Sequence, residues 1–394
     1  MNSGLVREFE KLLGPSSVLY RPEDLLLYEY DGSVVKGRPD LVVFPDSSKE
    51  VSRIVRLAAG YNIPIVGRGA GTGLSGGALA RTGGVMLVFA RMNRILALDT
   101  ENQRAVVQPG VVNYELTRAA EPYGLYFAPD PSSWKSCTIG GNVAENAGGP
   151  HTLAYGVTTN HVTALQLVLP DGEIVRLGGP HGDTPGYDLT GLFVGSEGTL
   201  TGSGAITKSG GRVVKNVTGY DLHKLLIGSL GTLAVITCLN FRTFPAPLAG
   251  SRGFVASFPN AEGALALRRA IAQSPLTPLT LDIVSPGLAQ IFATQAPATP
   301  EIAVFPGENR DVGSNSLPPI GDWFHPCEWH LCAAFAGTPE VLDRYKRDLS
   351  RLAGESGAIS TASSTTRRAP PCGDASAKLF PCCSSPRPSS ASSN

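Results

Sequence analysis

The residues best suited to chemistry lie in a glycine-rich stretch, PIVGRGAGTGLSGGAL, from Pro64 to Leu79. Six of its sixteen residues are glycine, and its only charged side chain is Arg68. Because glycine lacks a Cβ atom, successive backbone N–H groups in such a stretch can turn toward a bound anion. Arg68 can add a charge-assisted hydrogen bond, and the hydroxyls of Thr72 and Ser75 can add neutral ones. The pattern predicts a cradle for a phosphate or pyrophosphate rather than a plain surface turn.

The same stretch contains a GxGxxG pattern, from Gly71 to Gly76, which also occurs in Rossmann dinucleotide-binding folds. In those folds the pattern opens a helix, and an acidic residue follows about 20 residues later at the end of a strand. Here the pattern runs into further glycines and then into the strand-like segment Val85 to Ala90. The spacing therefore favours a loop between two strands and disfavours a nicotinamide-dependent Rossmann enzyme.

A second glycine-rich stretch, APDPSSWKSCTIGGNVAENAGG, runs from Ala128 to Gly149. Its glycines indicate close backbone approaches. Its side chains include uncharged hydrogen-bond donors such as Ser133, Thr138 and Asn142. A mostly neutral surface of donors suits an aromatic ring with carbonyl groups better than it suits a metal. The alternative interpretation is a long irregular loop without a binding role.

The neighbouring sequence predicts the elements that position these stretches. Asp40 to Pro45 is typical of a buried strand, and Ser47 and Glu50 form a capping box that opens an amphipathic helix. Ile63 to Val66 then forms a strand that leads into the first glycine-rich stretch, which completes a compact β-α-β unit. Further strands are predicted at Val85 to Ala90, Ile95 to Asp99 and Arg104 to Val107, and a further helix at Val111 to Glu121.

The composition limits the classes of function. The chain has 394 residues, of which 42% are hydrophobic and 17% charged, and its formal net charge is zero. It can bury two substantial cores, and its charge gives no reason to expect nucleic acid or anionic lipid as a partner. No apolar run approaches the roughly 20 residues of a membrane span. The first residues lack the apolar core of a signal peptide, so we expect a cytoplasmic location.

The seven cysteines do not follow the spacing of a disulfide framework. Cys327 and Cys332, together with His325 and His330, could be interpreted as a metal cluster. Their spacing is not a common zinc pattern, and strand alternation would put only His330 and Cys332 on one face. We therefore predict no metal site and no structural disulfide.

Three motifs in a fixed order carry a resemblance to a known family. They are VGRGAGTGLSGGAL, PDPSSWKSCTIGGNVAENAGG and GLFVGSEGTL, the last from Gly191 to Leu200. In this order they resemble the FAD-binding PCMH-type domain of the vanillyl-alcohol oxidase/p-cresol methylhydroxylase superfamily. Within that superfamily they are most similar to the FAD subunits of the glycolate oxidase and D-lactate dehydrogenase type. The resemblance covers residues 1 to about 200.

The resemblance implies that FAD is held by three groups of residues. One group cradles the pyrophosphate, one lines the flavin ring and ribityl chain, and one closes the site. In that order the groups are Arg68, Gly69, Ala70, Gly71, Thr72, Gly73, Leu74, Ser75 and Gly76; then Pro131, Ser132, Thr138, Gly141, Asn142, Ala144 and Gly148; then Glu197 and Gly198. Some members of the family attach FAD to a histidine in or near the first loop. No histidine lies between Gly67 and Ala80, so we expect noncovalent FAD.

An internal repeat follows the third motif. Residues 187–200 and 220–233 share 9 of 14 residues, and the match extends upstream to give two units, 172–200 and 204–233. Two copies are too few for a solenoid. Ser209 to Pro247 resembles the other flavin subunit of the same glycolate oxidase complex. The chain thus resembles the front half of one subunit joined to the back half of its paralogue, and we expect only one copy to be packed in the FAD-binding domain.

The predicted fold class is α+β. A two-subdomain FAD-binding domain over residues 1–245 precedes a partial α+β cap over residues 250–355. Strands in the cap are expected at Gly253 to Phe258, Leu279 to Val284, Glu301 to Phe305 and Trp329 to Phe335, and helices at Ala261 to Gln273 and Pro339 to Ala353. Residues 356–394 contain few large apolar groups, so we expect a disordered tail.

The resemblance also implies a reaction, in which a 2-hydroxy acid such as glycolate or D-lactate loses a hydride to the flavin and the electrons pass to an iron-sulfur partner subunit. No catalytic residue follows from the sequence. His151, His161, His181 and His223 are candidates for the base only because they lie near the flavin motifs, and a structural role is the more common one for each. The alternative function is a noncatalytic FAD-carrying or assembly subunit of such a complex.

Overall fold

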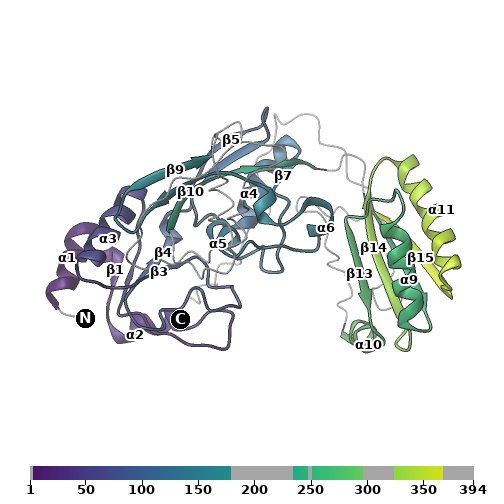
Figure 1. The fold of residues 1–394 in the computed structure, drawn as a ribbon, viewed down its shortest axis with the longest axis horizontal. Coiled ribbons are helices and arrows are strands. Elements are labelled where there is room, and N and C mark those ends of the chain that lie inside the picture. The colour runs from purple at the N-terminus through teal and green to yellow at the C-terminus, as the bar shows by residue number, and fades with distance from the viewer. Residues whose placement is uncertain (1–2, 179–233, 247–250, 296–323, 367–394) are drawn as a thin grey trace, which may run out of the picture.

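The computed structural model describes residues 3–178, 234–246, 251–295 and 324–366. Figure 1 shows a larger lobe, formed by the described residues up to 246, and a smaller lobe, formed by those from 251 onward. Both lobes combine helices with sheets, so the predicted α+β class is confirmed. The repeated units beyond residue 178, and the strand expected at 301–305, lie outside the described residues.

The first sheet of the larger lobe has the strand order β1-β2-β4-β3. Its strands are β1 (Val18–Leu19), β2 (Leu41–Val43), β3 (Ile65–Arg68) and β4 (Val85–Val88). β4 is parallel to both β2 and β3 and lies between them, whereas β1 is antiparallel to β2. The first glycine-rich stretch leaves the carboxyl end of β3 and leads into β4. This confirms the predicted loop between two strands.

The helix α3 (Ser48–Gly60) connects β2 to β3 and begins as its sequence predicts. The side chain of Ser47 accepts the backbone N–H of Glu50, and the Glu50 carboxylate accepts the N–H of Asp46 at 2.9 Å. The first bond satisfies a donor that the first turn would otherwise leave unpaired, and the second pairs the N–H of the residue before the N-cap. The apolar face of α3, with Val51 and Ile54, packs with α1 (Ser3–Leu13) against the first sheet.

The second sheet of the larger lobe has the order β5-β6-β10-β8-β9. Its strands are β5 (Ile95–Asp99), β6 (Arg104–Val107), β8 (Val162–Val168), β9 (Ile174–Gly178) and β10 (Val235–Arg242). β10 pairs antiparallel with β6 on one side and with β8 on the other. A strand from far along the chain therefore occupies the centre of this sheet.

The remaining helices and strands of the larger lobe are short. α4 (Asn113–Ala120) packs on the second sheet through Leu116, and α5 (Ile139–Ala144) packs there through Ile139 and Val143. β7 (Leu125–Tyr126) pairs with β11 (Phe244–Pro245). The other short helices are α2 (Pro22–Leu25), α6 (Thr152–Tyr155) and the 3₁₀ turns Pro15–Ser17, Leu26–Tyr28, Phe89–Arg91, Glu121–Tyr123 and Thr158–Asn160.

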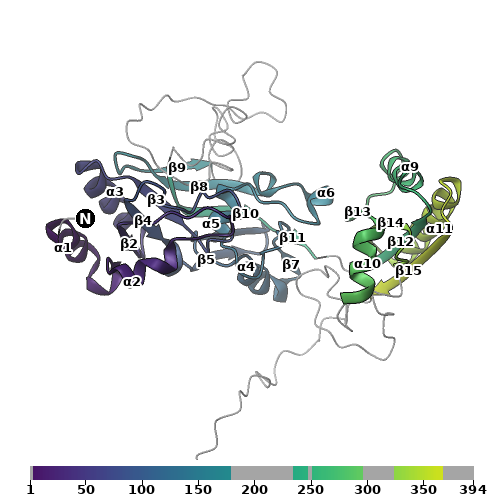
Figure 2. The same cartoon turned by 90° about the horizontal axis from the view of Figure 1, so that it is seen from below.

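The smaller lobe is one antiparallel sheet in the order β13-β14-β12-β15. Figures 1 and 2 show two of its helices, α9 (Ala261–Ala272) and α11 (Pro339–Glu355), on the face of the sheet turned away from the larger lobe. Apolar residues of both helices share one core with the sheet. The other elements are α10 (Pro286–Gln295), β12 (Ser251–Phe258), β13 (Thr280–Val284), β14 (Trp329–Ala336) and β15 (Ser360–Thr366).

The strand β15 corrects the expected start of the disordered tail at residue 356. β15 pairs antiparallel with β12 from Ser360 to Thr366 and forms an edge of the sheet. Its sequence, STASSTT, has few apolar side chains, which is why the composition indicates disorder. An edge strand gains its pairing from backbone hydrogen bonds, and threonine is favoured in strands, so a sequence without a hydrophobic face can still join a sheet.

A small apolar cluster connects the two lobes. Tyr126 and Ala128 of the larger lobe are buried together with Leu279 of the smaller lobe, and Ala334 of β14 packs against them. Tyr155 and Phe244 complete the cluster with edge-to-face aromatic contacts, their ring centroids 5.3 Å apart. The cluster lies beside the 128–149 stretch, so contacts between the lobes are made close to it.

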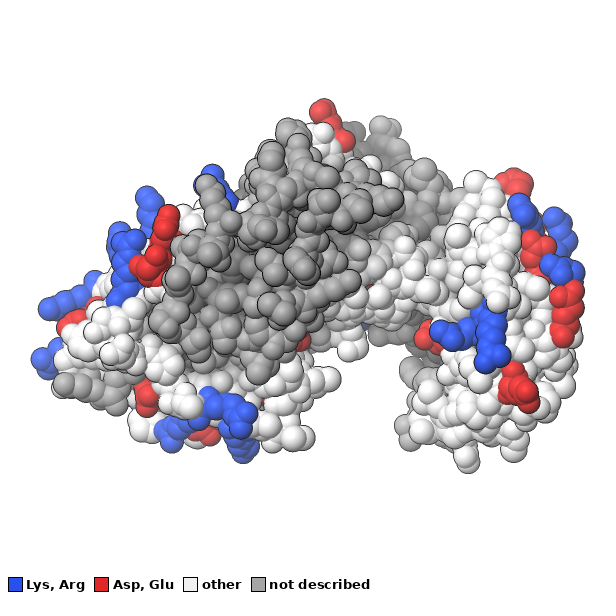
Figure 3. Space-filling view, in the orientation of Figure 1, with Lys and Arg blue, Asp and Glu red and all other residues white. Residues whose placement is uncertain are grey.

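The charged side chains visible in Figure 3 are of both signs and are mixed over both lobes. They form no large field of one sign, in keeping with a formal net charge of zero. Within the described ranges, none of the helices has the length and hydrophobicity that crossing a membrane requires.

Candidate functional site

The two glycine-rich stretches face each other across one cleft. The loop after β3 forms one wall, and the 131–138 segment with α5 forms the other. Val235 and Ile236 of β10 lie in the floor. Eleven of the residues predicted to bind FAD line this cleft: Arg68, Gly69, Ala70, Gly71, Thr72, Gly73, Pro131, Thr138, Gly141, Asn142 and Ala144.

The other predicted residues lie elsewhere. Leu74, Ser75, Gly76, Ser132 and Gly148 do not line the cleft, and Leu74 is 78% exposed. A Cβ atom on Gly148 would contact the Thr152 side chain, so this glycine serves the packing of its own turn. Glu197 and Gly198 lie outside the described residues. The assignment of individual residues to FAD remains a prediction.

Three alternate glycines of the first loop each face a polar side chain. At each of them a Cβ atom would overlap that side chain, so only glycine lets the polar group lie against the loop backbone. The pairs are Gly69 with the Thr138 hydroxyl, Gly71 with the Arg68 guanidinium, and Gly73 with the Glu145 carboxylate. Gly71 also has a φ of +70°, which disfavours any residue with a side chain. These glycines therefore leave room for the polar side chains that line the cleft, in addition to letting a phosphate approach the backbone.

Arg68 supplies the positive charge of the cleft. It is the last residue of β3 and is 7% exposed. Its guanidinium donates to the carbonyl of Ala78 at 3.4 Å and lies 5.8 Å from the centre of the Tyr28 ring. Burial lowers the pKa of the guanidinium, with the charge of Asp31 acting in the opposite direction. In the part of the chain that the structure describes, Arg68 forms no ion pair, so its charge is available to an anion.

The opposite wall is built on α5. Thr138 caps this helix by accepting the N–H of Gly141 at 3.3 Å. Asn142 is 2% exposed, and its Nδ2 donor has no oxygen or nitrogen partner among the described residues, although the same side chain lowers the pKa of the Cys137 thiol by hydrogen bonding. Leaving a buried amide donor unpaired costs about 1–3 kcal/mol. The orphaned donor therefore indicates that this wall is made to hold a ligand with hydrogen-bond acceptors.

Several residues of the cleft are not indicated by the sequence motifs. Glu145 lies at the C-terminal end of α5 and lines the cleft with Cys137. The spacing of Thr138, Asn142 and Glu145, at positions i, i+4 and i+7, is that of one helical face and could have revealed this wall. No sequence pattern places Val235 and Ile236 in the cleft, because their position depends on the pairing of β10 in the second sheet.

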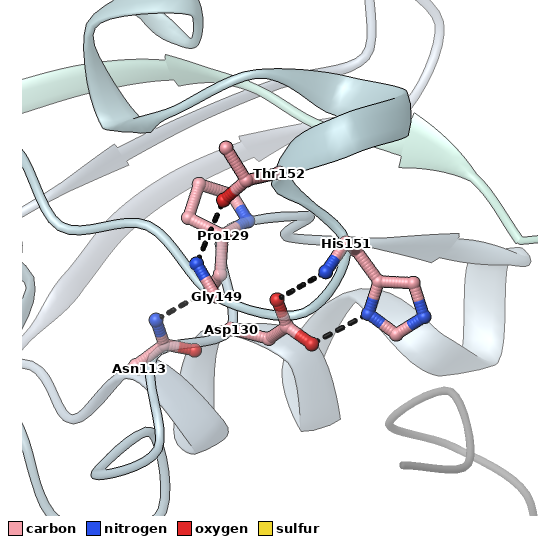
Figure 4. Close-up of polar contacts among 6 residues, drawn as sticks. All are labelled: Asn113, Pro129, Asp130, Gly149, His151 and Thr152. Carbon is pink, nitrogen blue, oxygen red and sulfur yellow. Dashed lines mark hydrogen bonds and ion pairs between the residues drawn. The ribbon is translucent and has the colours of Figure 1, made fainter. Parts of the chain in front are cut away.

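Figure 4 shows a buried hydrogen-bonded pair, Asp130 and His151, next to the cleft. The Oδ2 atom of Asp130 is 2.5 Å from Nδ1 of His151, and Oδ1 accepts the backbone N–H of His151 at 3.3 Å. The side chain of His151 is 3% exposed. Two further bonds hold the same loops, from Gly149 N–H to the Thr152 hydroxyl at 2.8 Å and from the Asn113 amide to the Pro129 carbonyl at 2.9 Å.

Two further histidines, His161 and His330, are also enclosed. His161 is fully buried between Phe127 and Phe244, and burial lowers its pKa to about 4, so it is neutral at pH 7. His330 is held by the Ser257 hydroxyl at 2.9 Å and the His325 carbonyl at 3.0 Å. Both ring nitrogens of His330 therefore have protein partners. His181 and His223 lie outside the described residues.

Residues 39–178 match a protein family described as "FAD binding domain". This range includes both walls of the cleft. This part of the chain is an FAD-binding domain. The match agrees with the cleft itself, in which a buried cation, a glycine loop and an orphaned amide donor suit a ligand that combines phosphate with a carbonyl-bearing ring. The resemblance to FAD-linked oxidases that the motifs indicate is confirmed for this domain.

Curated relatives of the FAD-binding domain are named for oxidation of 2-hydroxy acids. The glycolate oxidase subunit GlcD of Bacillus subtilis is 50% identical over 177 residues, and that of Escherichia coli is 48% identical over 184 residues. A D-lactate dehydrogenase of Anaerostipes hadrus is 42% identical over 199 residues. These matches cover 44–50% of this chain but only 37–42% of the relatives. The chain therefore matches about two fifths of their length.

Solved structures with the same fold cover more of the chain at lower identity. An alkyldihydroxyacetonephosphate synthase aligns with 91% of this chain and 62% of its own, at a TM-score of 0.67 and 20% identity. A p-cresol methylhydroxylase aligns with 92% of this chain and 67% of its own, at a TM-score of 0.61 and 19% identity. These similarities show the PCMH-type fold. The resemblance of residues 209–247 to a second flavin subunit stays a prediction.

Proposed function

We propose that this chain is an FAD-binding oxidoreductase subunit of the glycolate oxidase and D-lactate dehydrogenase type. It would oxidise a small 2-hydroxy acid and pass the electrons to a partner, for which an iron-sulfur subunit is the candidate. The observation that carries this proposal is the cleft between the β3 loop and α5, which lies in the part of the chain that matches the FAD binding domain family. The names of the sequence relatives support the substrate class. The cytoplasmic location remains the expectation from the sequence.

Different residues of the cleft would contact different parts of FAD. Arg68 and the backbone N–H groups of the loop from Gly69 to Gly73 would hold the pyrophosphate. Thr138 and Asn142 would donate hydrogen bonds on the opposite wall, and Val235 and Ile236 would pack beneath the ligand. No histidine lies in the loop, which supports noncovalent attachment.

Bound FAD would supply the acceptor for a hydride, and the protein would orient it and exclude water. The removal of the hydroxyl proton from the substrate needs a base. His151 is engaged with Asp130 and His161 is buried among aromatic rings, so neither offers a base to the cleft. The catalytic base remains unassigned.

The enclosure of these two histidines favours a second candidate function, that of a noncatalytic FAD-carrying subunit. Both functions require FAD, but only the first requires turnover by this chain alone. The difference can therefore be measured on the purified protein.

The proposal is tested by an absorption spectrum followed by an activity assay. We expect a flavin spectrum that passes wholly to the supernatant after acid precipitation. A protein without flavin that does not bind added FAD would contradict FAD binding, and flavin in the pellet would contradict noncovalent attachment. Reduction of an artificial acceptor with glycolate or D-lactate would support the oxidase. A flavin-loaded protein without turnover would support the carrier.

A further inference from the structure

Glu145 introduces a negative charge into a cleft that otherwise suits an anion. It is the C-terminal cap of α5, and its side chain is exposed and lines the cleft. The carboxylate lies at Gly73, where a Cβ atom would overlap one of its oxygens. A carboxylate accepts hydrogen bonds and repels phosphate, so this part of the cleft favours a ligand's hydrogen-bond donors over its phosphates.

A positive charge lies against the same loop, two residues before Gly73. The Arg68 guanidinium lies at Gly71, and the Glu145 carboxylate lies at Gly73. Both side chains line the one cleft, and Arg68 is buried without an ion pair among the described residues. The backbone at Gly71 therefore lies beside a group that attracts phosphate, and the backbone at Gly73 lies beside a group that repels it.

Glu145 also acts on a neighbour in its own wall of the cleft, within the second glycine-rich stretch. Burial raises the pKa of the Cys137 thiol, hydrogen bonds from the Ser133 and Asn142 side chains lower it, and the charge of Glu145 is a smaller cause that raises it. The unpaired amide donor of Asn142 lies on the same wall, one helical turn from Glu145. A ligand in this region meets a donor and an acceptor together, and this pairing suits a polyhydroxylated chain better than a phosphate.

We propose that Glu145 fixes the direction in which the dinucleotide lies in the cleft. Its carboxylate accepts a hydrogen bond from a sugar hydroxyl of bound FAD and keeps the pyrophosphate at the Arg68 end of the loop. The inference rests on the proposed FAD binding. Both the ribityl chain and the adenosine ribose carry such hydroxyls. FMN contains only the first and ADP only the second, so these two ligands distinguish the sources.

The test measures binding to the full-length protein after flavin removal, by quenching of flavin fluorescence and by competition. Glu145→Ala is expected to bind FAD about 10- to 100-fold more weakly than the wild-type chain, as for the loss of a hydrogen bond to a charged group. Inorganic pyrophosphate, which competes for the same cleft, is expected to bind this variant at least as tightly as the wild type. A loss of affinity for FMN points to a ribityl hydroxyl, and a loss for ADP points to a ribose hydroxyl.

Glu145→Gln keeps an acceptor but removes the charge. It is expected to lose less FAD affinity than Glu145→Ala and to bind pyrophosphate no more weakly than the wild type. Glu101→Ala, which removes an exposed carboxylate in the turn between β5 and β6, is the matched control and should change neither affinity.

Two outcomes would overturn the inference while leaving the proposed function in place. One is wild-type FAD affinity in Glu145→Ala. The other is a parallel loss of FAD and pyrophosphate binding, which a damaged fold would produce. A wild-type chain that binds no FAD would instead overturn the proposed function, and this inference with it.

Discussion

Asp130 contacts His151 through both carboxylate oxygens, one with the ring nitrogen Nδ1 and one with the backbone N–H. The contact connects the loop after β7 to the turn before α6. The first of these segments continues into the wall of the cleft, and the second leads to Tyr155 in the cluster between the lobes. The pair therefore fixes a junction between the cleft and the smaller lobe.

His151→Ala should destabilise the protein, because it leaves the Asp130 carboxylate buried without its ring partner. Leaving a buried acceptor without its partner costs about 1–3 kcal/mol of the free energy of unfolding. His151→Asn retains a side-chain donor and should lose less of the free energy of unfolding than His151→Ala. Urea unfolding of the two variants provides the measurement, and equal stability of His151→Ala and the wild type would contradict the role given to the pair.

Gly73→Ala should weaken FAD binding through Glu145 rather than through the backbone. The new Cβ atom would displace the Glu145 carboxylate, which is the flexible end of a side chain. In a protein that already carries Glu145→Ala, the same substitution should therefore have little further effect. Coupling energies of about 0.5–3 kcal/mol are typical for residues in contact.

The measurement is a double-mutant cycle on FAD affinity. Gly71→Ala serves as a comparison, because its φ of +70° makes the alanine strained whatever its neighbours are. Its effect should persist in the Glu145→Ala background. Additive effects of Gly73→Ala and Glu145→Ala would show that the two residues do not meet.

Deletion of residues 360–394 should destabilise the smaller lobe, whereas deletion of 367–394 should leave its sheet intact. The longer deletion removes β15 and leaves the edge of β12 unpaired. A loss of about 1–2 kcal/mol corresponds to a melting temperature lower by roughly 4–16 °C for a unit of this size. Differential scanning calorimetry of both truncations checks the expectation. Identical melting temperatures would mean that β15 contributes nothing to stability.

Stability should fall as the pH is lowered from about 6.5 toward 4, in part because of His161. Its pKa is about 4 in the folded protein, below the 6.5 of an exposed histidine, so the unfolded chain binds the extra proton in this range. The burial of neutral His161 therefore lowers the free energy of unfolding by about 3 kcal/mol at acid pH, and this loss is complete once the pH is below 4. Urea unfolding at pH 7 and pH 4.5 measures it. His161→Phe removes the titration, so this variant should show a smaller pH dependence than the wild type.

The sequence predicts the first wall of the cleft well because its signals are local. The capping box of Ser47 and Glu50, the strand before Arg68 and the glycine loop all depend on residues close together in the chain. Their elements are confirmed to within two or three residues. The neighbours of β10 in the second sheet depend on pairing between strands far apart in the chain, so the sequence does not indicate them.

The elements that the sequence does not predict depend on tertiary context. α5 is short and contains two glycines, which oppose helix formation, and its Thr138 cap and its packing on the second sheet outweigh this preference. β15 lacks a hydrophobic face and forms only because β12 offers a partner. Glu145 could have been found from its helical spacing, but only after α5 had been recognised.

The central position of β10 has a consequence for how the chain is synthesised. Until residues 235–242 leave the ribosome, β6 and β8 have no strand between them, and each presents an unpaired edge to other chains. The nascent segment that matches the FAD binding domain family, residues 39–178, therefore emerges before the strand that closes its sheet. Such a segment expressed alone would carry open strand edges and would tend to aggregate, and chaperones would be needed longest during this interval of translation.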